Sequence, residues 1–477
     1  MCRMLIITLI ICLWLLPASL VRAEFQAGAA TSNITPELGH AIIGGFVPFP
    51  SRHVHDELHA RCLVVDDGAT RLALVVCDLL GIDRIVSEEA RELIATRHGI
   101  PREQVLISAT HTHSASSALG KDSRVLNQTA DEYQRFVARR IADGVARAIN
   151  NLRPAELAFG AVEAPEHVFN RRWHMREGTV PVNPFNGTDQ VKMNPPAGSE
   201  NLTDPAGPTD PVVSFLSLRD LEGYPIAVYA AYSLHYVGGV GNGDISADYY
   251  AVFCEHLKEL LADDARPKSL PPFVAMLANG TSGDINNINF RQPRGRKLPY
   301  EQIRYVGEDV AAKVHSSLGD LKYQRELKLA AAYREPEVGL RRPTPEQLAW
   351  AEQTLADGKK NDRDLSYIYA QRTLQMAAYP ETTTVPVHLL RIGDVSIGTM
   401  PFEVFCETGL DFKSRSPFQH AFMVELAHGY YGYLPTPRHH KLGGYETWLG
   451  TCRVQPETSE KLLETLLEMA AELQKQP

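Results

Sequence analysis

The stretch from Val105 to Ser114 constrains the fold of this chain more than any other. Val105 to Ala109 is a short, mostly apolar run, which predicts a strand buried on both faces. His111 and His113 follow it directly, and open α/β sheets place their binding sites at the carboxyl ends of strands. At this spacing both imidazoles point to the same side of an extended segment, so one can bind a metal while the other moves a proton. Two surface histidines in a loop would give the same pattern.

Apolar runs and amphipathic segments alternate along the rest of the chain, as they do in α/β folds. The runs that predict strands are 60–65, 71–77, 226–234, 273–278, 384–392, 395–400 and 421–426. The segments with helical periodicity are 87–98, 129–150, 247–263, 301–321, 343–358 and 456–473. Asp66-Asp67-Gly68 separates the first two runs and predicts a hairpin. Ser87 is the expected N-cap of the first helix.

Two regions lack this periodicity. Residues 24–60 carry turn residues and small residues, and residues 165–210 form a stretch rich in Asn, Gly and Pro that predicts a long, functional loop. No internal repeat, charge block or low-complexity linker divides the chain. We therefore expect one α/β domain over residues 24–477.

Residues 1–23 read as a secretory signal peptide. Arg3 forms a short positive region, Leu5 to Leu16 is an unbroken apolar run, and small residues precede a cleavage site after Ala23. An uncleaved anchor helix would need a longer apolar run. No other stretch reaches eighteen apolar residues, so an exported protein without an integral membrane segment is expected.

Charge and cysteine content exclude several classes of function. A formal net charge of −9 argues against nucleic acid and anionic membrane surfaces as partners. Five cysteines follow the predicted signal peptide, and no two of them form a CxxC pair, which argues against a thiolate metal site. Four of the five lie in apolar contexts, which predicts buried free thiols, namely Cys62, Cys77, Cys254 and Cys406.

Polar residues able to do chemistry follow five apolar runs. They are His111 with His113, His235, Gly283 with Asp284, Glu403, and Tyr433. A single histidine at a strand end commonly serves only as a hydrogen-bonding residue, and a glutamate after proline is commonly a solvated turn residue. The shared position after five strands instead indicates convergence on one rim. Two neutral imidazoles and one carboxylate form a catalytic zinc set that leaves a coordination position open for water, whose pKa falls to about 7.

These residues also carry a resemblance to a known family. The chain resembles the catalytic domain of the neutral (non-lysosomal) ceramidases from Asn33-Ile-Thr-Pro36 to the last predicted helix. The most specific segments are Ser108-Ala-Thr-His-Thr-His-Ser114, Asn170-Arg171, Ile245-Ser-Ala-Asp248, Gly283-Asp284-Ile285, Pro401-Phe-Glu403, and Tyr433 with Tyr445-Glu446. The order of these segments and the step from Tyr433 to Tyr445 match the family.

The resemblance implies a fold, a cofactor and a set of site residues. The fold is α/β, with mixed β-sheets flanked by helices and an active site on loops at the strand ends. The cofactor is Zn²⁺, and its implied ligands are His111, His235, Glu403 and Tyr433. His113, Arg171 and Tyr445 are implied to surround the scissile carbonyl, where His113 shuttles a proton to the leaving amine and Arg171 or Tyr445 donates to the oxyanion.

The chain departs from the family in two respects. Asn286 stands where the family has its active-site serine, and an amide can hydrogen-bond a substrate but cannot act as a hydroxyl nucleophile. This departure puts ceramide in doubt as the substrate more than it does metal-dependent hydrolysis. The chain also ends soon after the catalytic domain, so no C-terminal immunoglobulin-like domain is expected.

The sequence therefore predicts an exported, zinc-dependent hydrolase of ceramidase type that cleaves an amide, with an N-acyl lipid or a small molecule as substrate. One alternative is a metalloenzyme of the same fold that acts on a carbohydrate derivative, with Asn286 and the 165–210 loop contacting sugar hydroxyls. Another is an inactive binding protein that keeps the metal for structure. The presence of His113, Arg171 and Tyr445 beside the implied ligands argues against this second alternative.

Overall fold

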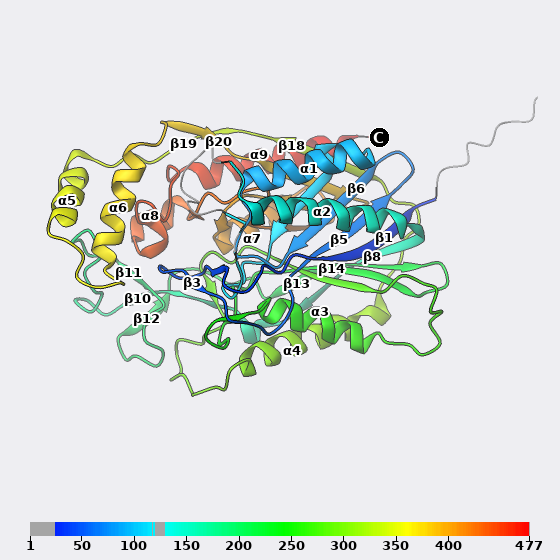
Figure 1. Cartoon of the computed structure of the whole chain (residues 1–477), viewed down its shortest axis with the longest axis horizontal. Helices are drawn as coiled ribbons and strands as arrows, with labels where there is room; N and C mark the ends of the chain where they lie inside the picture. The colour runs from blue at the N-terminus through cyan, green and yellow to red at the C-terminus, as the bar shows by residue number, and fades with distance from the viewer. Residues whose placement is uncertain (1–23, 117, 120–128, 477) are drawn as a thin grey trace, which may run out of the picture.

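The structure is a computed structural model that describes residues 24–116, 118–119 and 129–476. The predicted signal peptide, residues 1–23, lies outside the described residues. Two mixed β-sheets form the centre of the molecule, and helices cover their outer faces (Figure 1). This arrangement is the predicted α/β class with mixed sheets flanked by helices.

The larger sheet has eight strands in the order β16-β14-β13-β8-β1-β5-β6-β7. Their bounds are β16 Val274–Asn279, β14 Pro225–Tyr232, β13 Val212–Asp220, β8 Arg153–Glu163, β1 Gln26–Asn33, β5 His59–Asp66, β6 Arg71–Cys77 and β7 Val105–Ala109. Most neighbours are antiparallel, but β6 and β7 are parallel, as are β14 and β16. The predicted hairpin at Asp66-Asp67-Gly68 is confirmed, because β5 and β6 pair antiparallel from Ala60 with Cys77 to Asp66 with Arg71.

The smaller sheet has four strands in the order β18-β21-β22-β24. Their bounds are β18 Leu329–Arg334, β21 Val387–Ile392, β22 Val395–Thr399 and β24 His420–Val424. One face of this sheet packs against the larger sheet, with Leu390, Ile397 and Phe422 meeting Leu74 and Met276 in a shared core. The two sheets therefore form the inner layers of a four-layer molecule.

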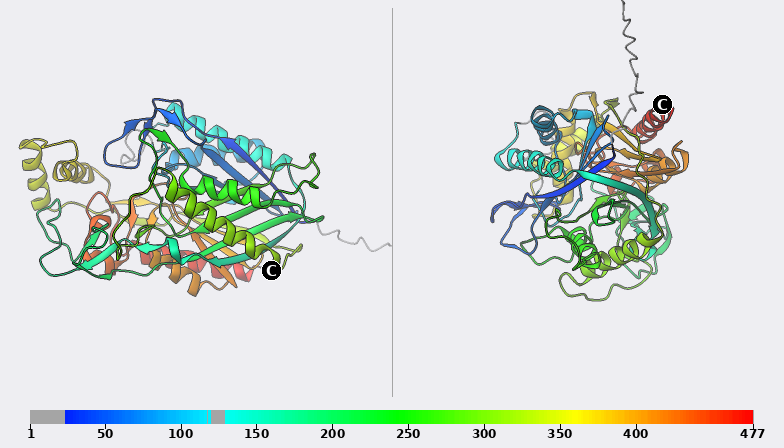
Figure 2. Two further views of the ribbon diagram at one scale, coloured as in Figure 1. Left: turned by 90° about the horizontal axis from the view of Figure 1, so that it is seen from below. Right: turned by 90° about the vertical axis from the view of Figure 1, so that its right-hand side faces the viewer.

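Helices close the two outer layers (Figure 2). On the larger sheet, α1 and α2 cover one half of the outer face and α3 and α4 cover the other half. On the smaller sheet, α7 and α9 cover the outer face. The bounds are α1 Arg84–His98, α2 Glu132–Asn150, α3 Asp248–Leu260, α4 Glu301–Ser317, α7 Cys406–Arg415 and α9 Thr458–Lys475. Helices α5 Pro345–Ala356 and α6 Leu365–Ala377 lie together at one end of the molecule.

The start of α1 differs from the prediction. Asp83, not Ser87, is the N-cap, and its carboxylate accepts a hydrogen bond from the backbone N–H of Ile85 at 3.1 Å. Ser87 lies inside the helix, where it is buried and its hydroxyl lies 3.0 Å from Nδ1 of His428. Both residue types favour the N-cap position, so residue type alone did not distinguish them.

Two expectations for irregular segments were wrong. Residues 26–33, within the region of expected turns, form β1 in the middle of the larger sheet. Its small residues let α2 approach closely, because a side chain at Gly28 would collide with the carbonyl oxygen of Ala148. The stretch 165–210 contains a three-stranded sheet, which is built from β10 Arg172–Met175 between β11 Val191–Met193 and β12 Leu202–Pro205. Strands this short carry too few residues for a periodic signal.

No helix among the described residues is both long enough and apolar enough to cross a bilayer. The four cysteines predicted to be buried free thiols are buried and unpaired in the structure, and so is Cys452. Burial raises the pKa of the Cys62 thiol to about 12, as expected for a thiol that serves as a small apolar residue.

Candidate active site

The ends of strands from both sheets meet at one place. At the end of β7, the backbone N–H of Ala109 donates to the carbonyl of Leu426, which follows β24. After β16, the carbonyl of Asn279 accepts from Glu425, and the N–H of Gly283 donates to the carbonyl of Val404. These hydrogen bonds join the larger sheet to the smaller one beyond their strand ends. Residues from distant parts of the chain are thereby brought to one rim.

His111 presents one ring nitrogen to this rim. Its Nδ1 lies 2.7 Å from the carbonyl oxygen of Leu80. A carbonyl can only accept, so Nδ1 carries the hydrogen and Nε2 presents a lone pair. Nε2 lies 3.1 Å from Nε2 of His113 and 3.3 Å from Oε2 of Glu403.

His235, which follows β14, is held in the same way. Its Nδ1 lies 3.2 Å from the carbonyl oxygen of Ser282, and its Nε2 lies 3.7 Å from Oε2 of Glu403. Burial, together with the positive charge of Arg171, lowers the pKa of His235 well below its ordinary value. Desolvation and the neighbouring His111 likewise lower the pKa of His113. Both rings are therefore neutral at pH 7, which is the form that binds a metal.

Glu403 and Tyr433 lie opposite each other in a two-stranded sheet. They are the first residues of β23 Glu403–Val404 and β25 Tyr433–Leu434, which pair in parallel. Oε1 of Glu403 accepts a hydrogen bond of 2.7 Å from the hydroxyl of Tyr430, whereas Oε2 is buried and accepts none. Burial raises the pKa of this carboxyl, but His111 and Arg171 outweigh it and hold the pKa below its ordinary value.

The donor atoms of this cluster fit a metal ion. One ring nitrogen from each of His111, His113 and His235 lies within 4.8 Å of the other two. Oε2 of Glu403 faces two of these rings without a hydrogen bond. Lone pairs that point at one another in a buried space repel unless a cation lies between them. Two imidazoles anchored at Nδ1 and one carboxylate are a typical ligand set for zinc.

Arg171 connects the cluster to a buried carboxylate. Its Nη2 donates to the hydroxyl of Tyr433 at 3.0 Å and to the carbonyl of Gly283 at 2.7 Å, while its Nε donates to Glu446 at 3.0 Å. Arg172, the next residue, donates to the other oxygen of Glu446 at 2.6 Å. The Arg171 guanidinium is therefore paired with a carboxylate and is fixed against the predicted ligands.

Tyr445 lies beside the cluster, but Asn286 lies outside it. The Tyr445 ring is 5.7 Å from the ring of Tyr433, and it lines the same hollow as His111 and Glu403. The amide of Asn286 donates to Asn194 at 3.2 Å, on the strand pair formed by β17 Ile285–Asn286 and β9 Phe169–Asn170. No hydrogen bond joins Asn286 to the predicted ligands in the part of the chain that the structure describes.

Sequence reasoning missed a second buried carboxylate behind His235. The hydroxyl of Ser282 lies 3.3 Å from Nδ1 of His235 and donates to Glu425 at 2.7 Å. Burial raises the pKa of Glu425 well above its ordinary value, although the hydrogen bond from Ser282 opposes this. Glu425 lies at the end of the run 421–426, so the rule that singled out the other strand ends would also have found it.

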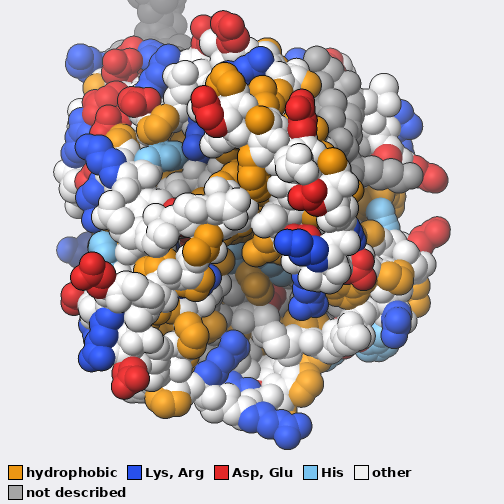
Figure 3. All heavy atoms as spheres, turned by 90° about the vertical axis from the view of Figure 1, so that its left-hand side faces the viewer, with side chains coloured by type: hydrophobic (Ala, Val, Ile, Leu, Met, Phe, Trp, Pro, Cys, Tyr) orange, Lys and Arg blue, Asp and Glu red, His pale blue; other side chains and the backbone are white. Residues whose placement is uncertain are grey.

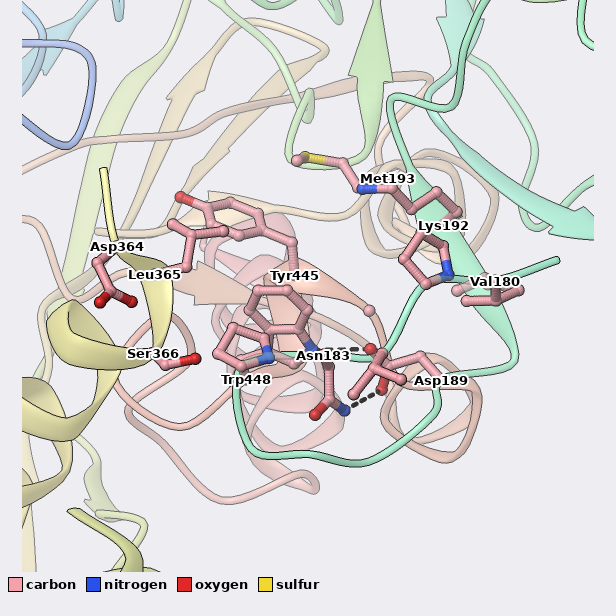
Figure 4. Close-up of a pocket in the computed structure, with 15 residues that line it drawn as sticks. Val180, Asn183, Asp189, Lys192, Met193, Asp364, Leu365, Ser366, Tyr445 and Trp448 are labelled. Atoms are coloured by element: carbon pink, nitrogen blue, oxygen red, sulfur yellow. Dashed lines mark hydrogen bonds between the residues drawn. The ribbon is translucent and has the colours of Figure 1, made fainter. Parts of the chain in front are cut away.

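Two hollows meet at Tyr445. One, of about 190 Å³, is lined by His111, His113 and Glu403 of the cluster and by Arg372 and Arg453. The other, of about 280 Å³, lies beside Trp448 (Figure 4). Figure 3 shows that the end of the molecule near α5 and α6 is hollowed, with Lys and Arg side chains around the opening.

Comparisons with known proteins are in line with this geometry. The sequence model of the family described as neutral/alkaline non-lysosomal ceramidase, N-terminal, matches residues 25–294. Two solved structures are similar in fold at 18% sequence identity. A ceramidase complexed with C2 has a TM-score of 0.68 over 95% of this chain and 76% of the other. A neutral ceramidase from Pseudomonas aeruginosa has a TM-score of 0.67 over 94% of this chain and 74% of the other.

Proposed function

Because this chain belongs to the neutral/alkaline non-lysosomal ceramidase family, we propose that it is an exported, zinc-dependent hydrolase that cleaves an amide bond in an N-acyl compound. The observation that carries this proposal is the buried cluster of His111, His235 and Glu403. Its acceptor atoms face one another, and Oε2 of Glu403 has no hydrogen-bond donor.

Four residues would hold the ion, namely His111, His235, Glu403 and Tyr433. A bound zinc ion supplies a water molecule activated at neutral pH and polarises a carbonyl group. The anchoring of both imidazoles at Nδ1 orients their Nε2 atoms, and Tyr430 orients the carboxylate of Glu403.

The remaining side chains suit the two halves of amide hydrolysis. His113 is neutral and lies 3.1 Å from Nε2 of His111, where it can take a proton from the attacking water and give it to the leaving amine. We expect Arg171 or Tyr445, which both lie beside Tyr433, to donate to the oxyanion that forms when water adds to the carbonyl carbon. The C–N bond then breaks, and the products are a carboxylate and an amine. Asn286 faces Asn194 and takes no part in these steps.

The test of this proposal combines metal analysis with an activity screen on the full chain after signal cleavage. We expect about one zinc per chain, loss of the metal in His235→Ala, and hydrolysis of an N-acylsphingosine or another N-acyl amide that a chelator abolishes. The matched control is His256→Ala, because His256 lies on α3 and bonds only Glu259 among the described residues. Wild-type protein that binds no zinc would contradict the metal site, and a zinc-loaded protein that cleaves no N-acyl amide would contradict the reaction.

A further inference from the structure

An arginine without an acidic partner lines the hollow that holds the predicted metal ligands. Arg372 comes from α6, and its Nη1 lies 3.5 Å from the hydroxyl of Thr451. Its Nε is buried and has no hydrogen-bond partner. Its guanidinium otherwise lies over the rings of Tyr369, at 4.9 Å, and Phe46, at 5.5 Å. No acidic side chain in the described ranges forms an ion pair with it.

The fully buried arginines of this protein are paired, whereas Arg372 as a whole is half-buried. Arg171 and Arg172 share Glu446, and Arg61 bonds Asp78. Taking a guanidinium partly out of water without a partner costs free energy, so proteins rarely do it without a use for the charge. Half-buried arginines such as Arg341 and Arg391 also have no ion pair among the described residues, but they donate to backbone carbonyls. Arg372 instead donates to the hydroxyl of Thr451, and it lies in the candidate active site.

The position of Arg372 is built by its neighbours. Gly450 has a φ of +90°, and a side chain there would place its Cβ 2.8 Å from Cβ of Arg372. The hydroxyl of Tyr369, one turn earlier on α6, lies 2.5 Å from the hydroxyl of Thr451, and so fixes the helix against the 448–452 turn. The absence of a side chain at Gly450 thus leaves room for the arginine to lie against the turn.

A second arginine adds positive charge to the same hollow. Arg453 also lines it, and its guanidinium lies 5.9 Å from the ring of Tyr430, which bonds Glu403. A planar guanidinium binds the oxygens of a carboxylate or a phosphate through two parallel hydrogen bonds. The hollow is thus suited to an oxyanion and poorly suited to a second cation.

We propose that the substrate carries a carboxylate or phosphate group and that Arg372 binds this group beside the scissile amide. This inference rests on the proposed amide hydrolysis and names its substrate class, an N-acyl amine with an anionic group. A ceramide has hydroxyl groups but no charge, so it is not the preferred substrate in this assignment.

From the residues that line the two hollows, we infer that the anionic group belongs to the amine half of the substrate. His113, which gives its proton to the leaving amine, lines the hollow that contains Arg372. The hollow on the other side of Tyr445 is lined by Lys192 and Asp364 and by several apolar residues that suit an acyl chain (Figure 4). These apolar residues are Val180, Val182, Val191, Met193, Leu365 and Trp448. Its polar residues bond partly to one another, since Asp189 accepts from Asn183 and from Trp448.

The test uses three N-dodecanoyl amides of similar size, made from glycine, ethanolamine and phosphoethanolamine. With the zinc-loaded wild-type protein, we expect kcat/KM for a charged amide to exceed that for the neutral ethanolamine amide by about 10- to 100-fold, the range for one hydrogen-bonded charge. The glycine and phosphoethanolamine arms distinguish a carboxylate from a phosphate. Arg372→Ala should remove the preference, whereas Arg334→Ala, which changes a surface arginine paired with Glu468 and Glu472, should keep it.

The outcomes separate this inference from the function on which it rests. Equal cleavage of all three amides, or a preference for the neutral one, would overturn the anion site and leave the hydrolase intact. If no amide is cleaved, the proposed reaction is wrong. Calorimetric measurement of the affinity for each intact amide then tests whether Arg372 binds an anion. Tighter binding of a charged amide that is lost in Arg372→Ala supports the site, and equal binding overturns it. The wild-type comparisons do not depend on whether the variant folds.

Discussion

At the scale of single residues, Glu446 is the carboxylate that pairs with two neighbouring arginines in the candidate site. One carboxylate bonds Arg171 through Oε1 and Arg172 through Oε2, and it is fully buried. Burial raises the pKa of Glu446, but the two guanidinium groups outweigh it and hold the pKa below its ordinary value. Because Arg171 in turn bonds Tyr433, the position of a predicted ligand depends on this carboxylate.

The variant Glu446→Gln should therefore be strongly destabilised. Removing the charge leaves two buried guanidinium groups without a counter-ion, and breaking a buried pair in this way costs about 3–5 kcal/mol. Urea unfolding with the wild type as reference measures the loss. Glu468→Gln, which removes an exposed partner of Arg334, is the control and should cost less than about 1 kcal/mol. A loss as small as the control's in Glu446→Gln would contradict the role assigned to this residue.

At the scale of elements, the start of α3 holds the turn that follows His235. The carboxylate of Asp248 accepts from the backbone N–H groups of Val237 and Gly238, at 3.0 and 2.8 Å. The hydroxyl groups of Tyr249 and Tyr250 both donate to the carbonyl of Leu234. The first turn of one helix thus fixes the backbone on both sides of a predicted ligand.

This arrangement predicts a pH dependence of stability. Burial raises the pKa of Asp248 from 3.8 to about 6. Between these values the folded protein binds more protons than the unfolded chain, so the contribution of Asp248 to stability falls as the pH rises through this window and stays low above it. The stability of the wild type relative to Asp248→Asn should therefore fall by about 2 kcal/mol from pH 4 to pH 7.

Urea unfolding of both proteins at the two pH values measures this change. Asparagine tolerates the φ of +60° at this position, so the variant keeps the backbone conformation. Asp264→Asn, at an exposed site, is the control for the substitution itself. A stability difference that does not change with pH would show that folding does not raise the pKa of Asp248.

At the scale of the whole molecule, the predicted metal ligands come from both sheets. His111 and His235 follow strands of the larger sheet, whereas Glu403 and Tyr433 follow strands of the smaller one. An ion bound by all four would link the two inner layers at their ends. Such an ion binds the folded chain and not the unfolded one, so it should stabilise the complete fold.

Removal of zinc should therefore lower the Tm of the protein. At a free zinc concentration a hundred times the Kd, the stabilisation amounts to about 3 kcal/mol. Thermal unfolding with and without a chelator measures it, and added zinc should restore the Tm. His235→Ala should unfold at the same temperature with and without the chelator. A chelator effect of equal size in this variant would show that the ion stabilises another site.

Much of the fold was predictable because its signals are local. The strand Val105–Ala109 and the helix that ends at Asn150 have the predicted type, since both depend on periodicity over a few residues. β1 was missed because its small residues carry no apolar period, although contact with α2 favours them there. Arg372 was missed for a similar reason, since nothing near it in the sequence shows that its helix lies against Gly450.

The sequence by itself determined which residue types end the strands, and hence that imidazoles and carboxylates would be available near one rim. Only the tertiary structure decided which of these side chains face one another at the predicted metal site and which bond other residues. Glu403 is left with a free oxygen facing two imidazoles, Asn286 turns to Asn194, and Glu446 pairs with Arg171 from 275 positions away. The reason is that strand formation depends on neighbours in the chain, whereas the pairing of buried charges depends on how two sheets pack.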